Sequence, residues 1–432
     1  MDPYPLPLIR RLTERLTPAL RQTGLLFALD MVTNATDYGF HIYLGRVLNA
    51  GDFAVVQTVN SLVLIIVTTF SVLQPTVARY AAAHESPERH GYFQQFTRLS
   101  VWAGLLLAIL CIAWRGPLGA WLRIPPLTVA LLGGLMLMAC IRPVLAGMLQ
   151  GQQQFVGFGL VRTGFAFGRF LFAILLITLL GSSAINAVAA YPLGGLISLG
   201  VALLFLGRSV WQRGASIPTQ TINEGLRLSL AAFFAYVAFM SLQNVDLIWV
   251  NRTFSAELAG SYATAVVLRR ILAVLPLAVT VILYPRIAAT VADSNLPDRL
   301  IARAAVLIIL PTVLLAAIYA LAGDWIVRLV FGNGYTQAGT LLGTFGIAMI
   351  GFGLATLWLN LYLATRPWLF VLLLAALAVG QLFALQMVQP TTLMQTAQIF
   401  AAGGWGCAIG GGLLYTGWLQ PKLSENGRDG SR

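Results

Sequence analysis

Five arginines and three aspartates lie inside long apolar stretches of this sequence: Arg142, Arg162, Arg169, Arg269, Arg270, Asp30, Asp37 and Asp246. A charged side chain costs about 2.5 to 3.5 kcal/mol at the centre of a helix that faces lipid. Several of the eight must therefore face protein or water. Guanidinium groups bind phosphate and carboxylate oxygens through charge-assisted hydrogen bonds, and a net positive set inside low-dielectric walls attracts anions.

The spacing of these residues is helical. The stretch 24–44 carries one polar stripe at positions i, i+4, i+7 and i+11, formed by Asp30, Asn34, Asp37 and His41. Arg162 and Arg169 are seven residues apart on the stretch 155–180, so they share a face. Each stripe predicts a helix whose polar side contacts protein or a water-filled space rather than lipid.

A second group of polar residues recurs in the same way. On the stretch 260–285, Tyr262 and Arg269 are seven residues apart. By helical rise, Arg269 and Arg270 lie about 14 Å from the outer end of that stretch, close to the middle of a membrane. Further polar positions follow a helical period on 53–78 and on 228–250, namely Gln57, Ser61, Thr68, Ser71, Gln243 and Asp246.

Structural roles remain open for most of these charges. Asp30 or Asp37 can serve to neutralise a buried arginine, and Asp246 lies close enough to a helix end to be a terminal residue. Arg142 and Arg162 can extend toward lipid headgroups. Arg269 and Arg270 lie too deep for that, so they are the best candidates for contact with an anionic ligand.

The elements that must position these residues are membrane-spanning helices. Hydrophobic residues make up 58% of the chain and charged residues 10%, whereas a soluble domain has about 25% charged residues. A bilayer core needs roughly 20 apolar helical residues. Gly, Pro and charged boundaries give twelve such spans, near 24–44, 53–78, 96–114, 127–149, 155–180, 185–207, 228–250, 260–285, 303–322, 339–363, 368–388 and 395–418.

The distribution of basic residues predicts the topology. With both termini inside, the inner segments hold most of the Lys and Arg residues, as the positive-inside rule requires. Residues 1–22 have apolar and basic faces and are expected to form an amphipathic interfacial helix. The net charge of +12 therefore reflects topology, and no nucleic-acid partner is predicted. We expect a multi-pass protein of the bacterial cytoplasmic membrane.

Neither a metal site nor a cofactor is predicted. The three cysteines, Cys111, Cys140 and Cys407, lie in apolar segments, and their odd number does not suggest a disulfide framework. The three histidines have no ligand spacing such as HExxH.

An internal repeat divides the chain. Residues 51–82 read GDFAVVQTVNSLVLIIVTTFSVLQPTVARYAA, and residues 256–290 read AELAGSYATAVVLRRILAVLPLAVTVILYPRIAAT, about 205 positions later. The repeat predicts an all-α polytopic fold of two pseudo-symmetric six-helix lobes, with a substrate cavity between them. The expected parts are an N-lobe at 23–213, a cytoplasmic linker at 214–222, a C-lobe at 223–420 and a cytoplasmic tail at 421–432.

Several short motifs resemble those of a known family. They are LQGQQQF (149–155), VDLIWVNRTFSAELAGSYATA (245–265), YPRIAA (284–289) and VFGNGYTQA (330–338). At these positions they resemble the polysaccharide and lipid-linked oligosaccharide flippases of the multidrug/oligosaccharidyl-lipid/polysaccharide (MOP) exporter superfamily. The same superfamily contains the multidrug and toxin extrusion (MATE) antiporters. The resemblance extends over essentially the whole chain beyond the N-terminal helix.

This resemblance implies a MATE-like fold, alternating access, and a glycan cargo linked through diphosphate to a polyprenyl carrier. Cationic cavity residues would hold the diphosphate and the glycan, and Arg269, Arg270 and Arg46 match that pattern. Arg169, Asp30, Asn34, Asp37, Asp246 and Tyr262 complete the expected cavity. The partners expected are an anionic lipid-linked glycan, membrane lipids and a coupling proton or sodium ion, with the chain acting as a monomer. The peptidoglycan-precursor branch typically has fourteen spans and is disfavoured by a count of twelve.

Two other hypotheses remain open. A cation-coupled multidrug antiporter would have the same architecture, but it requires the aspartates to dominate the cavity charge. A glycan polymerase or ligase would need a long external loop with catalytic groups, whereas the external connections here are short. The sequence therefore predicts a transporter and not an enzyme.

Overall fold

The structure is a computed structural model of residues 1–432. It describes the backbone except at residues 1–5, 213, 218, 293–297 and 420–432. Side chains are described outside these residues and also outside 6–23, 219–222, 224, 228, 275–292, 298–300 and 418–419. The described residues form helices joined by short connections, as expected for a chain that must satisfy its backbone hydrogen bonds in lipid.

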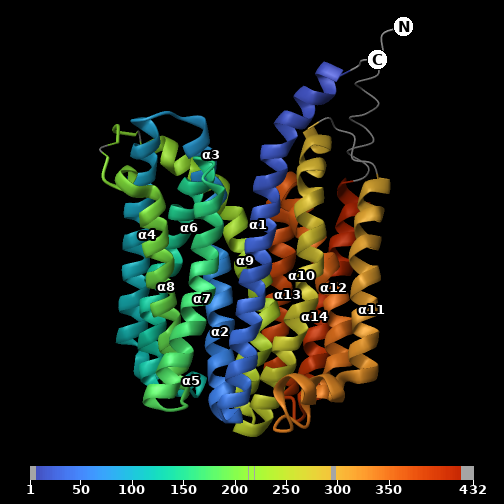
Figure 1. The fold of residues 1–432 in the computed structure, drawn as a ribbon. Coiled ribbons are helices and arrows are strands. Elements are labelled where there is room, and N and C mark those ends of the chain that lie inside the picture. The colour runs from blue at the N-terminus through green and yellow to red at the C-terminus, as the bar shows by residue number, and fades with distance from the viewer. Residues whose placement is uncertain (1–5, 213, 218, 293–297, 420–432) are drawn as a thin grey trace. The chain divides into compact units, whose positions relative to one another are not determined.

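The chain folds into two compact units. Unit 1 comprises Met1–Tyr43, Phe70–Gly116 and Pro126–Gly225. Besides most of helix α1 (Leu6–Val47), its helices are α3 (Leu73–Ala83), α4 (Glu88–Ala113), α6 (Pro126–Gly151), α7 (Phe155–Leu180), α8 (Ala184–Leu206) and the 3-10 turn η1 (Gly207–Val210). Helices α4, α6, α7 and α8 run side by side along their lengths (Figure 1).

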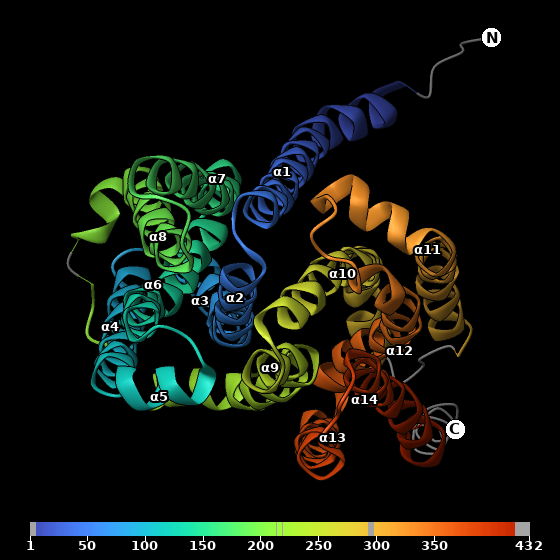
Figure 2. The same cartoon turned by 90° about the horizontal axis from the view of Figure 1, so that it is seen from below.

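Unit 2 comprises Leu44–Thr69, Pro117–Pro125 and Leu226–Arg432. Its helices are α2 (Ala50–Phe70), most of α9 (Thr219–Thr253), α10 (Ala256–Ala292), α11 (Asp298–Phe331), α12 (Ala338–Thr365), α13 (Pro367–Val388), α14 (Leu393–Leu414) and the π-helical turn η2 (Tyr415–Leu419). The chain passes from unit 1 to unit 2 within the short helix α5 (Arg115–Leu122). Seen end-on, α12 lies among α10, α11 and α14 (Figure 2).

Ten helices in the described part of the chain are long and apolar enough to cross a membrane. They coincide with ten of the twelve expected spans. The other two expected spans lie on α1 and α10. The apolar character of α1 is interrupted by its polar stripe, and the side chains of α10 beyond residue 274 lie outside the described residues.

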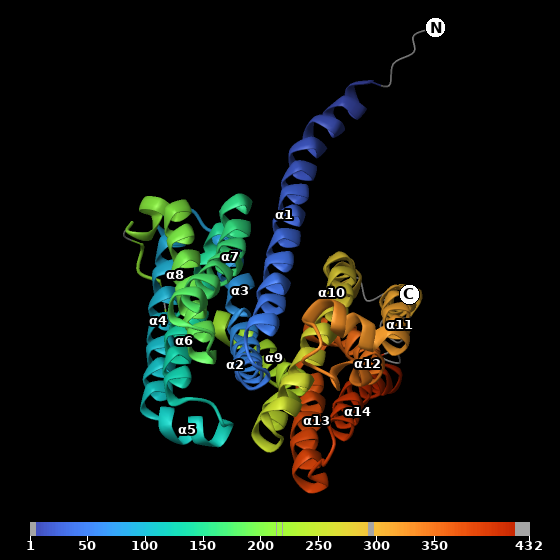
Figure 3. The same cartoon turned by 60° about the horizontal axis from the view of Figure 1, so that its bottom comes forward.

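Helix α1 is continuous from Leu6 to Val47, without a break between the expected interfacial segment 1–22 and the first span. Its N-terminal part extends well beyond the ends of α7 and α8, its neighbours in unit 1 (Figure 3). The stretch 6–47 contains no proline except Pro7 and Pro18, so nothing beyond its first turns interrupts the hydrogen bonding of the helix. The side chains of residues 1–23, on which the amphipathic prediction depends, lie outside the described residues.

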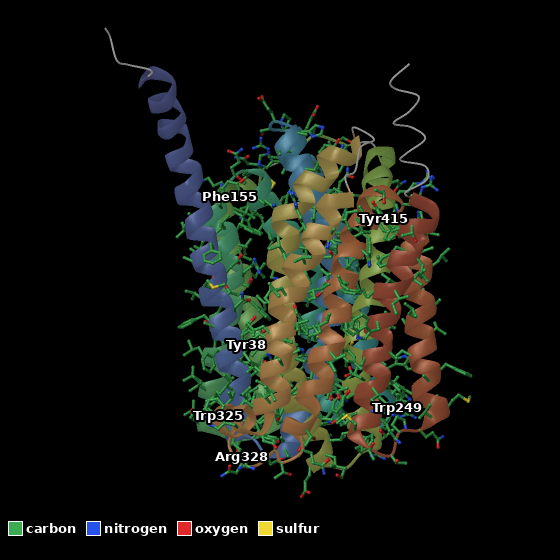
Figure 4. The ribbon with its side chains drawn as sticks, turned by 90° about the vertical axis from the view of Figure 1, so that its right-hand side faces the viewer. Tyr38, Phe155, Trp249, Trp325, Arg328 and Tyr415 are labelled. Carbon is green, nitrogen blue, oxygen red and sulfur yellow. The ribbon has the colours of Figure 1, made fainter. Side chains whose placement is uncertain are left out.

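The ends of unit 2 have distinct side chains. Trp249, Trp325 and Arg328 lie at one end of the unit, and Tyr415 lies toward the other (Figure 4). Trp325 is exposed. Tryptophan is enriched where a membrane meets water. The expected topology places Trp325 and Arg328 outside, and their common position at one end of the unit agrees with a shared membrane face.

Residues 44–69 belong to unit 2 together with residues far later in the chain. Phe53 on α2 packs against Phe331 and Tyr335, with ring centroids 6.0 and 5.7 Å apart. The Tyr335 hydroxyl donates a hydrogen bond to the Gly45 carbonyl at 2.7 Å. Burial raises the pKa of Tyr335 to about 12, so this donor keeps its proton at neutral pH. These contacts tie the start of α2 to the connection between α11 and α12.

Candidate functional site

Arg269, Asp246 and Tyr262 form one buried cluster in unit 2. The Arg269 Nη1 donates to Asp246 Oδ2, and Nη2 donates to Asp246 Oδ1 at 2.9 Å and to the Gln243 carbonyl at 2.6 Å. The Tyr262 hydroxyl donates to Asp246 Oδ2 at 2.7 Å. The side chains of Arg269 and Asp246 are 2% and 0% exposed. Tyr262 and Arg269, seven residues apart on α10, therefore both bind Asp246.

Aromatic rings enclose the same guanidinium. The Cζ atom of Arg269 lies 3.8 Å from the ring centroid of Phe400 on α14 and 4.7 Å from that of Phe345 on α12. A desolvated cation over an aromatic face gains about 2 kcal/mol or more. A carboxylate, a carbonyl and two aromatic rings therefore surround Arg269, which the sequence predicted to hold the anion.

Arg270 has different surroundings, although it is the next residue. Its Nη2 donates to Ser61 Oγ at 3.0 Å and to Asn244 Oδ1 at 3.2 Å, and its Nη1 donates to Gln57 Oε1 at 3.3 Å. All three acceptors are neutral side chains, and Arg270 is half-buried. Neighbouring residues on a helix point about 100° apart, so Arg270 leaves the ion pair of Arg269 and faces α2 and α9.

The close approach of α2 and α10 brings these groups together. A Cβ atom on Gly260 would lie 2.6 Å from the Ala50 carbonyl oxygen, so only glycine permits this contact. Gln57 and Ser61, spaced i and i+4 on α2, are fully buried and point toward Arg270. The polar stripe predicted on this helix therefore contributes to the surroundings of Arg270. Asn244 was not predicted; its only signal in the sequence is its position two residues before Asp246.

The polar stripes of α1 and α7 meet in unit 1. Arg162 Nη1 donates to Asp30 Oδ1 at 2.6 Å, and Arg169 Nη2 donates to Asp37 Oδ1 at 2.8 Å. Between them, the hydroxyls of Thr33 and Thr163 are 2.9 Å apart. The residue numbers rise together along both helices, so α1 and α7 run parallel, as the topology predicts for the first and fifth spans. Both aspartates form ion pairs with arginines, a role that the sequence left open.

Arg169 is buried although its partner is not. Its side chain is 5% exposed, whereas that of Asp37 is 41% exposed. The Cζ atom of Arg169 lies 4.0 Å from the ring centroid of Phe40 and 4.7 Å from that of Tyr191 on α8. Glycine is required at 194, because a Cβ atom there would lie 2.6 Å from the backbone nitrogen of Arg169. Helices α7 and α8 therefore pack closely at Arg169.

Two other predicted residues have no part in these clusters. Arg46 donates from Nε and Nη2 to the carbonyl oxygens of Val330 and Leu329 at 2.8 and 2.7 Å. It therefore caps the C-terminal end of α11, where unpaired carbonyls favour a cation. Asn34 is half-buried and makes no hydrogen bond to any residue that the structure describes.

The aromatic residues around the two buried arginines were also not predicted. Phe40, Tyr191, Phe345 and Phe400 lie on helices far from the arginines in sequence, and an aromatic residue in an apolar span is typical of ordinary core. Groups of His, Cys, Asp and Glu that could hold a metal ion do not occur among the described residues.

The fold matches that of known membrane transporters. A multidrug resistance MATE family transporter of the MOP superfamily, in an inward-facing conformation, superposes with a TM-score of 0.76 at 14% identity, covering 91% of this chain and 94% of the other. The lipid II flippase MurJ in an inward closed conformation gives 0.69 at 11% identity, covering 91% and 87%. A MOP superfamily transporter from Pyrococcus furiosus gives 0.56 at 14% identity, covering 92% and 93%. The chain therefore has the MATE-like fold.

The sequence itself identifies the family. The family described as polysaccharide biosynthesis protein matches residues 19–291, and the chain belongs to this family. No curated protein sequence matches the chain. The fold confirms the expected fold class.

Proposed function

We propose that this chain flips a polyprenyl-diphosphate-linked oligosaccharide from the inner to the outer leaflet of a bacterial cytoplasmic membrane by alternating access, for cell-surface polysaccharide biosynthesis. The N- and C-termini face the cytoplasm and the chain acts as a monomer. Within the site, Arg270 holds the diphosphate. Arg269 fixes α9 to α10 and positions Arg270 rather than touching the cargo.

The observation that carries this proposal is the neutral chemistry of three partners of Arg270. Its guanidinium donates hydrogen bonds to Gln57, Ser61 and Asn244 at 3.0 to 3.3 Å. A phosphate brings a full negative charge to the guanidinium and can accept two parallel N–H donors, which a neutral amide or hydroxyl oxygen does not. A diphosphate can therefore displace these acceptors from Arg270, and they can take the guanidinium back after release. A diphosphate would not displace the partner of Arg269 in this way, because that partner is a buried carboxylate.

The alternative is a cation-coupled multidrug antiporter, favoured by the likeness of the fold to a MATE family transporter. The described ion pairs argue against it. Each membrane aspartate singled out from the sequence, Asp30, Asp37 and Asp246, is bonded to an arginine. None is held ready for an organic cation. A proton or sodium ion as the coupling ion remains compatible with our proposal, and Asp37, the partly exposed partner of Arg169, is the best candidate to bind it.

The proposal is tested with Arg270→Gln in a strain that depends on this chain for its surface glycan. We expect export to fall at least tenfold while protein levels stay normal, and lipid-linked glycan to accumulate on the cytoplasmic leaflet. Arg270→Lys should retain part of the activity, because it keeps the charge but not the bidentate geometry. Arg328→Gln is the matched control, since Arg328 is exposed at one end of the same unit. Wild-type export by Arg270→Gln would disprove the assignment.

A further inference from the structure

We propose that unit 2 binds the headgroup of an anionic phospholipid at the C-terminal end of α9. The guanidinium groups of Arg123 and Arg252 and the indole N–H of Trp249 hold its phosphodiester. These residues have no part in the site around Arg270. The occupant is a lipid of the surrounding bilayer and not the cargo, so this inference does not rest on the proposed function.

Arg252 packs against two indole rings and keeps its hydrogen-bond donors free. Its Cζ atom lies 4.7 Å from the ring centroid of Trp121 and 6.0 Å from that of Trp249. Among the residues that the structure describes, Arg252 makes neither a hydrogen bond nor an ion pair. The N–H donors of a guanidinium lie in its plane. Rings against its face therefore leave those donors open to an oxyanion.

A second donor without an acceptor lies beside this guanidinium. The indole Nε1 of Trp249 is buried and has no hydrogen-bond partner within the described part of the chain. Trp249 and Arg252 are three residues apart on α9, so they share a face of the helix. A buried donor that stays unpaired costs free energy. A phosphodiester has two unesterified oxygens, which can accept from the indole and the guanidinium together.

Arg123 has a backbone conformation that favours glycine. It follows the last residue of α5 and has a φ of 53°. The Arg123 N–H donates to the Ala120 carbonyl at 3.4 Å, and the Ile124 N–H donates to the Gly119 carbonyl at 2.9 Å. Glycine is the usual residue at this point of such a helix end, because it adopts left-handed backbone without strain. Strained residues cluster at binding sites, and here the strained residue is a cation.

A hydrogen bond brings the two arginines to the same edge of unit 2. Asn251 Nδ2 donates to the Leu122 carbonyl at 2.9 Å, and both residues are buried. Arg252 and Arg123 are the residues that follow these two in the sequence. Neither arginine pairs with a carboxylate of any described residue. The edge therefore carries two uncompensated positive charges, which favour a lipid with net negative charge.

The depth of the site indicates a lipid headgroup. Helix α9 ends at Thr253, so Arg252 and Trp249 lie about 2 and 6 Å from its end by helical rise. Trp249 accordingly lies at one end of the unit (Figure 4). Lipid phosphates lie just outside the hydrocarbon core, and basic pockets at this level bind anionic headgroups. Trp121 is 53% exposed, so the site opens to the membrane surface.

The test measures the dissociation constant of phosphatidylglycerol from purified full-length protein in detergent, by native mass spectrometry. We expect Arg252→Gln to weaken binding about fivefold or more, and Arg252→Lys to recover part of the loss, because lysine keeps the charge without the planar fork. Trp325→Ala and Arg328→Gln are matched controls, since both residues are exposed at the same end of unit 2. Unchanged affinity in Arg252→Gln, or an equal loss in the controls, would overturn the proposal.

Arg123→Gly separates lipid binding from support of the fold. Glycine relieves the left-handed backbone at this position, so the apparent melting temperature of the lipid-free protein should rise. The affinity for phosphatidylglycerol should nevertheless fall several-fold, because one of the two cations is lost. A more stable variant that binds the lipid as tightly as the wild type would show that Arg123 does not contact the headgroup, and would refute the site as proposed.

Three competitors identify the occupant. Diacylglycerol lacks the phosphate and should not displace phosphatidylglycerol. Phosphatidylcholine should displace it several-fold less well than phosphatidylglycerol itself, because its choline cation opposes the charge of the site. Inorganic phosphate should compete only at much higher concentration, since it has no acyl chains. Displacement by diacylglycerol would indicate a purely apolar contact, equal competition by phosphatidylcholine would show that net charge is not recognised, and tight binding of inorganic phosphate would indicate a site for soluble anions. Each of these results would refute the proposal, and none depends on the export test of Arg270.

Discussion

Each unit buries an arginine between aromatic faces and pairs it with an aspartate, but the two pairs differ in how tightly they are closed. Arg269 gives Asp246 two N–H donors, and Tyr262 adds a third. Arg169 gives Asp37 one. Asp246 is 0% exposed and Asp37 is 41% exposed. The same chemical pair is therefore locked in unit 2 and can exchange partners in unit 1.

The difference follows from where each arginine comes from. Arg269 lies on α10, directly after α9, which carries Asp246, so the pair joins two consecutive helices across a short connection. Arg169 lies on α7 and Asp37 on α1, 132 residues apart. Helices α12 and α14 cover the first pair with Phe345 and Phe400. The second is covered on one side by Tyr191, and its carboxylate stays partly open. A closed pair stabilises the fold, whereas an open pair can respond to a ligand.

The largest loss of stability that this comparison predicts is that of Asp246→Asn. The substitution keeps the shape of the side chain but leaves Arg269 charged and enclosed without a counter-ion. Breaking a buried pair in this way costs about 3 to 5 kcal/mol. The free energy of unfolding in mixed micelles, measured by denaturant titration, should fall by that amount. A variant as stable as the wild type would mean that water or another carboxylate reaches Arg269, and the pair is not closed.

The next effect is that of Tyr262→Phe, which removes only the third donor to Asp246. A hydrogen bond to a charged group contributes roughly 1.5 to 3 kcal/mol, so we expect the free energy of unfolding to fall by about 2 kcal/mol. Tyr335→Phe is a control, since its hydroxyl bonds a neutral carbonyl, and its loss should be about half as large. Equal losses would indicate that the hydrogen bond of Tyr262 to the Asp246 carboxylate is no stronger than a hydrogen bond to a neutral carbonyl.

The sequence could predict many of the residues in the two ion pairs, but not which arginine lies in the closed pair. Spacing alone placed Tyr262 and Arg269 on one helix face, Asp30 and Asp37 on another, and Arg162 and Arg169 on a third. Helical periodicity fixes which residues share a face, but not which faces meet. The apolar spans were predicted for the same reason, since length and hydropathy are local properties.

The roles of Arg269 and Arg270 could not be separated in this way. They are adjacent, equally deep and chemically identical, so the sequence assigned both to the anion. What distinguishes them is the tertiary surroundings: α12 and α14 enclose one, and polar residues of α2 and α9 bind the other. Arg46 was grouped with them because the resemblance implies cationic cavity residues, and in the structure it caps α11. Long-range packing of this kind leaves no local signal.

A smaller effect is expected for Asp37→Asn. The carboxylate is partly exposed and accepts a hydrogen bond from Arg169 at 2.8 Å, and the rings of Phe40 and Tyr191 continue to hold the cation. Asparagine also keeps an acceptor oxygen. We expect a loss of about 1 kcal/mol in the free energy of unfolding, within the range for one hydrogen bond. A loss as large as that of Asp246→Asn would abolish the distinction between the two pairs.

The smallest effect is expected for the outermost pair, Asp30 with Arg162. Their side chains are 41% and 46% exposed, although they are only 2.6 Å apart. Exposed ion pairs contribute about 0 to 1 kcal/mol, so Asp30→Asn should change the free energy of unfolding by less than about 1 kcal/mol. Arg162→Gln should behave in the same way, and the double variant should show a coupling free energy within that limit. A larger coupling would show that lipid, and not water, surrounds this pair, because a hydrocarbon environment strengthens the attraction that water screens. The stability losses of Asp246→Asn, Asp37→Asn and Asp30→Asn would then not follow the solvent exposure of the three carboxylates. In unit 1, only the ion pair of Asp37 could still be described as open to solvent.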